Sequence, residues 1–150
     1  MIEVEASVVI ERPVEEVFAF FTDHRNDIRW QEGLLEVRVT PEGSTGIDTQ
    51  VMAVRKLLNR RADSTIVICE FTPNRKEAFR TVAGSPEVSG SLVYEASGRS
   101  TVVTLRLEMQ TDSFFSLPDP VVASSMRRNV ATGLAEAKDW LERMRGSGPE

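Results

Sequence analysis

From residue 33 onward, the sequence consists of short segments in which apolar and polar residues alternate, separated by turn-forming residues. A period of two is typical of β-strands with one buried face, and this close spacing is typical of an antiparallel meander. The segments that fit lie at residues 34–40, 49–57, 62–71, 78–82, 88–95 and 101–110. A further strand is predicted at residues 3–11. The pattern therefore constrains the chain to a sheet of about seven antiparallel strands, which has to twist and curl.

The alternation is clearest in residues 101–110, the last predicted strand. One face carries Val103, Leu105, Leu107 and Met109. The opposite face carries Val102, Thr104, Arg106 and Glu108. The sheet is therefore expected to have one dry face and one wet face, with Arg106 on the wet one.

Two short helices and one long helix accompany the predicted strands. Pro13 and the acidic residues after it are typical of a helix start, and a second short helix is predicted around Trp30. Asp119 is expected to cap, and Pro120 to open, a long amphipathic helix over residues 120–145. That helix would be about 39 Å long, enough to cross a small domain.

These elements predict an α+β chain in which a curved antiparallel sheet wraps around the C-terminal helix. We expect residues 1–150 to form a single domain with a flexible tail at residues 146–150. One helix has too narrow an apolar stripe to cover the whole concave face of such a sheet. We therefore expect a cavity beneath the helix, with the mixed apolar and polar lining of a small-molecule site.

Charge and cysteine content narrow the possible function classes. The net charge is −5 and the basic residues are scattered, which argues against binding to nucleic acid. The single cysteine permits no internal disulfide and the sequence has no Cys/His cluster, so we expect neither a metal nor a cofactor. No apolar run approaches the ~20 residues of a transmembrane helix, and the acidic N-terminal segment does not resemble a secretory signal. These features predict a cytoplasmic protein.

The run VVIERPVEEVF at residues 8–18, continued by residues 23–30, resembles the opening of the START-related superfamily. This superfamily, also called Bet v 1-like or SRPBCC, includes polyketide cyclase/dehydrase and lipid-transport proteins. The glycine-bearing turn at residues 43–49, Tyr94, residues 101–104 and the closing helix resemble its later elements. The resemblance covers nearly the whole chain and implies a helix-grip fold, but it says little about ligand or reaction. Members include carriers, ligand sensors, ubiquinone-binding proteins and a minority of enzymes.

The candidate ligand-binding residues are those expected on the dry face of the sheet, on the helix and at its entrance. They are Trp30, Phe79, Leu92, Tyr94, Leu105, Leu107, Phe114, Phe115, Met126, Val130 and Gly133. Trp30 could stack on a ligand or belong to the core, and the Tyr94 hydroxyl could bind a ligand carbonyl or phenol. Phe114 and Phe115 either cap the core or form a gate at the cavity entrance.

Few residues offer catalytic chemistry. His24 could act as a general base oriented by a nearby aspartate, but its polar turn favours an ordinary surface histidine. Cys69 lies in an apolar segment and is interpreted as a small buried hydrophobic residue, not a nucleophile. Tyr94 and Arg80 are the weak catalytic candidates, and the face on which Arg80 lies stays open.

The leading hypothesis is a cytoplasmic protein that carries or senses a small hydrophobic ligand, such as a polyketide, a quinone or a lipid. The alternative is an enzyme of the polyketide cyclase or dehydratase type, in which Tyr94 or Arg80 assists proton transfer in the same cavity. A third hypothesis is a protein-interaction module that uses the basic residues 55–61, which we interpret as a solvated hairpin tip. An outward-facing Trp140 is a candidate for the seam of a homodimer.

Overall fold

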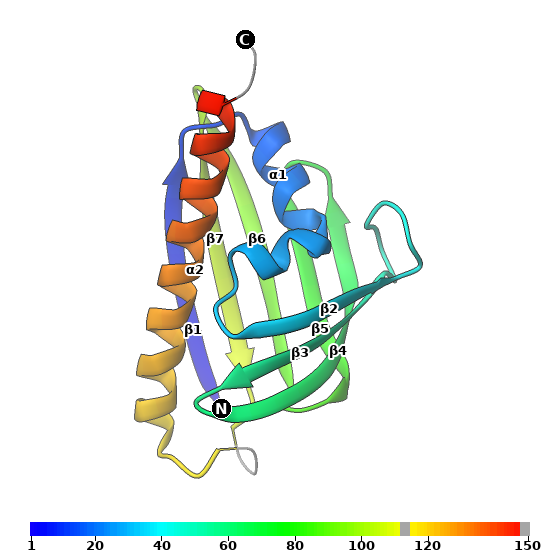
Figure 1. The fold of residues 1–150 in the computed structure, drawn as a ribbon, viewed down its shortest axis with the longest axis vertical. Helices are drawn as coiled ribbons and strands as arrows, with labels where there is room; N and C mark the ends of the chain where they lie inside the picture. Colours follow the sequence, from blue (N-terminus) through cyan, green and yellow to red (C-terminus); the bar gives the residue numbers. More distant parts are fainter. Residues whose placement is uncertain (112–114, 148–150) are drawn as a thin grey trace.

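The computed structural model describes residues 1–111 and 115–147, except for the side chains of residues 144–147. The chain forms one seven-stranded antiparallel sheet with its helices on the concave face (Figure 1). The strands are β1 (Ile2–Ile10), β2 (Leu34–Thr40), β3 (Gln50–Leu57), β4 (Arg60–Thr72), β5 (Lys76–Gly84), β6 (Val88–Ser97) and β7 (Ser100–Met109). The helices are α1 (Val14–Thr22), the 3₁₀ helix η1 (His24–Arg29) and α2 (Asp119–Ser147). The predicted α+β fold and its strand number are confirmed.

The strand order is β1-β7-β6-β5-β4-β3-β2, so β2 to β7 form a meander and β1 is added beside β7. Helix α2 lies along β1 at one side of the sheet, whereas α1 and η1 lie across the concave face (Figure 1). Aromatic rings pack at the junction of α1 and η1, where Phe21 lies edge-to-face on Phe20 and on Trp30, the residue that follows η1. The helices therefore cover the sheet from two directions.

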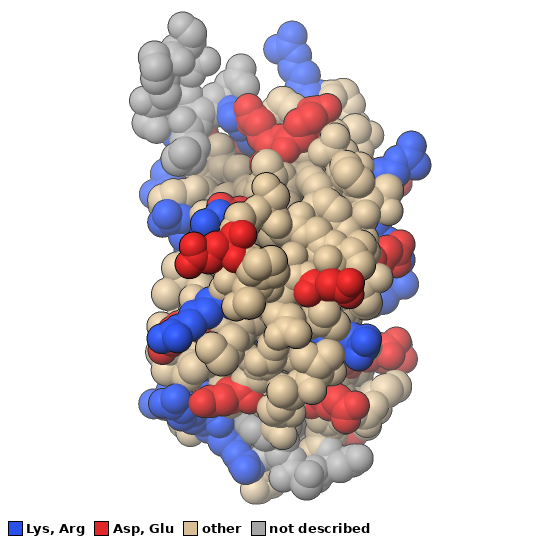
Figure 2. Space-filling model, turned by 90° about the vertical axis from the view of Figure 1, so that its right-hand side faces the viewer, with Lys and Arg blue, Asp and Glu red and all other residues tan. Residues whose placement is uncertain are grey.

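The wet and dry faces follow the predicted alternation. In β7, Val103, Leu105 and Met109 are buried, whereas Arg106 is exposed and pairs with Glu5 of the neighbouring strand β1. Figure 2 shows one side of the molecule, on which acidic and basic side chains are interspersed. The alternation thus separates the core from a charged, mixed surface.

The prediction that Cys69 is a buried residue is wrong, because its side chain is exposed. The pairing of β4 with β5 shifts between Ile68, which faces Phe79, and Glu70, which faces Ala78. Cys69 is the extra residue of this β-bulge, so it has no direct partner on β5. Its neighbour Ile68 keeps the buried position.

Helix α2 begins and ends close to the predicted positions. Asp119 is its first residue, but the Asp119 carboxylate accepts hydrogen bonds from the Thr111 hydroxyl at 2.6 Å and from the Met1 amino group at 3.3 Å. The amide N–H groups of Val121 and Val122 donate instead to the Pro118 carbonyl. At the other end the helix continues to Ser147, two residues beyond the prediction, and residues 148–150 of the expected tail lie outside the described residues.

Trp140 is half-buried against the core and does not project freely outward. The Arg29 guanidinium of η1 lies 4.6 Å from the centre of its ring. This cation–π contact joins η1 to α2. A role of Trp140 in a homodimer seam stays a prediction.

Gly133 lets α2 pack closely against Trp30, the residue that follows η1. A Cβ atom at this position would lie 2.8 Å from the Trp30 carbonyl oxygen and 3.1 Å from the Trp30 ring. Because a backbone atom blocks the space, we expect Gly133→Ala to lower the free energy of unfolding by about 1–3 kcal/mol. This holds although Ala is the better helix former by about 1 kcal/mol.

Denaturant unfolding of Gly133→Ala measures the effect. Thr132→Ala, at an exposed position of the same helix, serves as the control and is expected to stay within about 0.5 kcal/mol of the parent protein. An alanine at position 133 that leaves the stability unchanged or raises it would contradict the close packing of α2 on Trp30.

Candidate functional site

A partly enclosed cavity of about 150 Å³ lies between the concave face of the sheet and α2. Strands β3 to β7 supply one wall and α2 the other, with Trp30 between them. Most of the lining is apolar, and it comprises Trp30, Val51, Ala53, Leu57, Ala62, Ile66, Phe79, Pro86, Val88, Leu92, Leu105, Leu107, Met109, Met126, Val130 and Gly133. The remaining lining residues are polar: His24, Asp27, Gln31, Arg55, Ser64, Thr81 and Asn129.

The structure brings most of the predicted ligand-binding residues together at this cavity. Trp30, Phe79, Leu92, Leu105, Leu107, Met126, Val130 and Gly133 line it. Phe115 is half-buried against the core and is not part of the lining, while Phe114 lies outside the described residues. A ligand contact by any of these residues stays a prediction.

Tyr94 is buried but does not line the cavity. Its ring packs edge-to-face on Phe18 of α1, with a centroid distance of 5.1 Å, and lies near Phe21. Burial, together with the negative charges of Glu77 and Asp27, raises the pKa of Tyr94 well above its ordinary value. Tyr94 is therefore a neutral core residue under α1, which weakens its case as a ligand handle or proton donor.

Arg80, the other catalytic candidate, has an exposed side chain and does not line the cavity. Its neighbour Phe79 does, and successive side chains of a strand point to opposite faces. The position of Arg80 on the outer face separates it from any reaction in the cavity.

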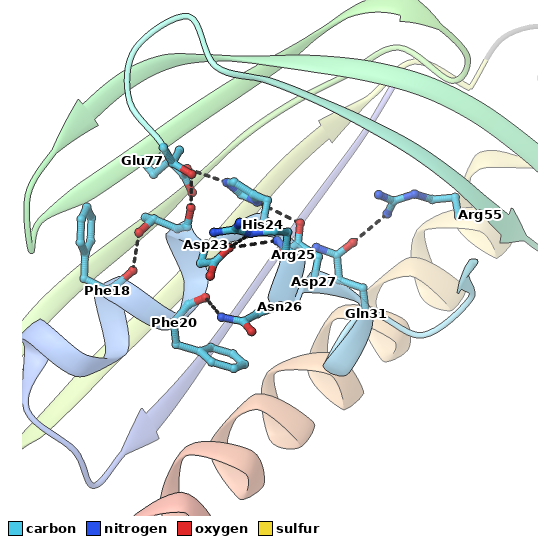
Figure 3. Close-up of polar contacts among 12 residues, drawn as sticks. Phe18, Phe20, Asp23, His24, Arg25, Asn26, Asp27, Gln31, Arg55 and Glu77 are labelled. Carbon is cyan, nitrogen blue, oxygen red and sulfur yellow. Dashed lines mark hydrogen bonds and ion pairs between the residues drawn. The ribbon is translucent and has the colours of Figure 1, made fainter. Parts of the chain in front are cut away.

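His24 is the centre of a buried polar cluster and not a surface histidine (Figure 3). Its Nδ1 atom lies 2.9 Å from Oδ2 of Asp27, and its Nε2 atom lies 2.7 Å from Oε2 of Glu77. Asp27 belongs to the same 3₁₀ helix, whereas Glu77 is a fully buried residue of β5. The imidazole thus clamps η1 to the sheet, and we call these three residues the histidine clamp.

The histidine clamp is a charged arrangement. Burial alone would lower the pKa of His24, but the negative charges and hydrogen bonds of Asp27 and Glu77 outweigh it. The pKa of His24 is therefore raised well above its ordinary value of 6.5. A protonated imidazole donates from both nitrogens, one to each carboxylate.

Arg55 lies beside the clamp and lines the cavity. Its Nη1 atom donates to Oε1 of Gln31 at 3.1 Å (Figure 3). Burial lowers the pKa of Arg55, and the charge of Asp27 acts in the opposite direction. A guanidinium nevertheless stays charged in proteins. The prediction that Arg55 belongs to the solvated hairpin tip is therefore wrong. Arg61 of the same hairpin is exposed and pairs with Asp63.

Sequence reasoning missed this polar end of the cavity, although one signal was present. Val51, Ala53, Arg55 and Leu57 follow the period of two in β3, and Glu77 and Phe79 follow it in β5. A charged residue on an otherwise apolar strand face indicates a buried polar site. The pairing of His24 with Glu77, 53 positions apart in the sequence, has no comparable local signal.

The raised pKa of His24 gives a stability prediction. Because the folded chain binds this proton more tightly, its contribution is fully present below about pH 6.5 and is lost as the pH rises through the folded-state pKa. We expect the free energy of unfolding to fall over that range in the parent protein. The fall should be absent in His24→Gln.

Denaturant unfolding at a series of pH values, compared between the two proteins, isolates the contribution of His24. Glu77→Gln serves as the matched variant and is expected to lower the titration midpoint of His24, followed by NMR of the imidazole. An imidazole that titrates at or below pH 6.5 in the parent protein would refute the charged clamp.

A curved antiparallel sheet that grips a long C-terminal helix over a cavity defines a helix-grip protein with a small-molecule-sized pocket. The chain belongs to the polyketide cyclase / dehydrase and lipid transport family, whose model matches residues 1–142. The resemblance stated from the sequence is thereby confirmed. Comparison with curated proteins gave no significant match.

Solved structures share the fold at low sequence identity. TTHA0849 from Thermus thermophilus is 20% identical, with a TM-score of 0.81 over 98% of this chain and 100% of that one. A START superfamily protein from Mycobacterium smegmatis is 13% identical, with a TM-score of 0.78 over 95% of this chain and 98% of that one. The Zhui aromatase/cyclase from Streptomyces sp. R1128 is 17% identical, with a TM-score of 0.76 over 99% of each chain. At these identities the similarity establishes the fold alone.

Two kinds of feature are absent from the residues that the structure describes. None of the helices there is both long and apolar enough to cross a membrane. Within the same residues, no group of three or more His, Cys, Asp or Glu side chains is arranged to hold a metal ion.

Proposed function

We propose that this protein binds a small, largely apolar ligand in the cavity between the sheet and α2, as a carrier or a sensor. The observation that carries the proposal is the cavity itself, whose walls are mainly apolar and whose titratable residues, His24, Asp27 and Arg55, lie on η1 and β3. Concave sites with this composition are typical of small-molecule binding. The family includes lipid-transport proteins by description, which agrees with this role.

The size of the cavity suggests the size of the ligand. An engineered apolar cavity of about 150 Å³ holds a benzene molecule. The cavity of this protein has a similar volume. A ring-sized body, such as part of a polyketide or a quinone head group, would therefore fit without a change in the walls.

Filling the cavity tests the proposal. Met126 is buried on α2 and lines the cavity, so a larger side chain there takes up ligand space. We expect Met126→Trp to weaken binding of an apolar fluorescent probe about ten-fold or more, because a ring-sized volume is lost. Fluorescence titration of the purified protein measures the affinity.

Arg127→Trp is the control, because it adds the same ring at the adjacent exposed position of α2. Its probe affinity is expected to match that of the parent protein. Thermal unfolding of both variants checks that the fold is kept. A parent protein that binds no apolar probe would overturn the ligand-binding proposal, and equal effects of the two substitutions would move the site away from this cavity.

A second candidate function is catalysis of the cyclase or dehydratase type. It is favoured by one observation: the Asp27 carboxylate lines the cavity, and its Oδ1 atom has no hydrogen-bond partner among the described residues, whereas Oδ2 contacts His24. A carboxylate placed in this way can take up a proton from a bound substrate. Mass spectrometry separates the two functions, because an enzyme would release a cyclised or dehydrated product, whereas a carrier would return its ligand unchanged.

A further inference from the structure

The guanidinium of Arg55 is a cation in a mainly apolar cavity. Its hydrogen-bond partner is the neutral side chain of Gln31, and it forms no ion pair with a carboxylate among residues 1–111 and 115–143. Placing an ion in such surroundings is costly unless an opposite charge meets it. A cation held in this way needs an explanation beyond the packing of the fold.

Neither carboxylate of the histidine clamp forms an ion pair with Arg55. His24 binds Oδ2 of Asp27 and Oε2 of Glu77, while Oδ1 of Asp27 and Oε1 of Glu77 have no hydrogen-bond partner among the described residues. Asp27 acts on Arg55 through its charge, and no ion pair or hydrogen bond joins the two side chains. The negative charge of Asp27 thus partly compensates the positive charge of Arg55, while the remaining N–H donors of Arg55 stay open to a ligand.

Gln31 fixes the orientation of this open cation. A guanidinium has five N–H donors, and the bond from Nη1 to Gln31 uses one of them. Because Gln31 is uncharged, it positions the group without neutralising it. The planar fork of donors that remains matches the two oxygens of a carboxylate better than a single carbonyl oxygen.

We propose that Arg55, positioned by Gln31, binds a carboxylate on the ligand, so that the ligand class is a compact apolar carboxylic acid with a ring-sized body. This inference rests on the proposed function and adds the chemical class of the ligand. The apolar walls receive the ring, and the acid group lies toward β3, where Arg55 lines the cavity. A neutral ligand of the same shape cannot form the ion pair with Arg55.

The experiment compares a matched pair of probes, benzoate and benzamide, by titration calorimetry on the intact protein at neutral pH. The two probes have nearly the same shape and differ in charge. We expect benzoate to bind about ten-fold or more tightly, the difference typical of a hydrogen bond to a charged group. We expect Arg55→Met to remove this preference, by weakening benzoate binding and leaving benzamide binding unchanged.

Arg61→Met is the control, because Arg61 lies on the same hairpin with an exposed side chain paired to Asp63. It is expected to bind both probes as the parent protein does. Arg55→Lys should retain part of the preference, since a lysine keeps the charge without the planar fork. The preference for the acid in the parent protein provides a test even if a variant at position 55 folds poorly.

The outcomes separate this inference from the proposed function. Equal affinity for the two probes, or an Arg55→Met variant that still prefers the acid, would overturn the carboxylate anchor and leave ligand binding intact. Binding of neither probe to the parent protein would overturn ligand binding, and the anchor with it.

Discussion

The pairing of β1 with β7 is the constraint on which the rest of the structure depends. Nine residue pairs, from Ile2 with Met109 to Ile10 with Thr101, place the first strand at the edge of the sheet beside the last. Helix α2 is held along that strand: Lys138 donates to the Val9 carbonyl, and Glu142 accepts from the Glu11 amide. Because α2 lies over one edge, α1 and η1 have to cover the rest of the concave face, and the cavity is the space that they leave.

Most of the architecture could be predicted because it depends on local pattern. The period of two in β7 decides which side chains face the core, and Pro118 and Pro120 lie where α2 begins. The strand ends were less accurate, since β5 extends beyond the predicted residues 78–82 on both sides. The bulge at Cys69 was missed because a bulge depends on how two strands pair, not on the sequence of one of them.

The polar end of the cavity could not be predicted to the same degree, for two physical reasons. His24 and Glu77 meet only once the sheet has curved over η1, and no property of either segment reveals the partner. Arg55 is close in sequence to the exposed residues Arg60 and Arg61. Because residues 55–61 were interpreted as one exposed basic segment, the position of Arg55 in the cavity lining was missed. The apolar lining was easier, because any buried face of this sheet contributes to it.

The pairing of β1 with β7 also affects how the protein folds during its synthesis. On the ribosome, β1 is made before the five strands of the meander that precede β7, yet its sheet partner is β7. Contacts between segments so distant in the chain form late, because a long loop must close first. The apolar residues of β1 therefore lack their sheet partner until β7 has been synthesised. Exposed apolar residues of this kind make a nascent chain prone to aggregation, from which chaperones protect it.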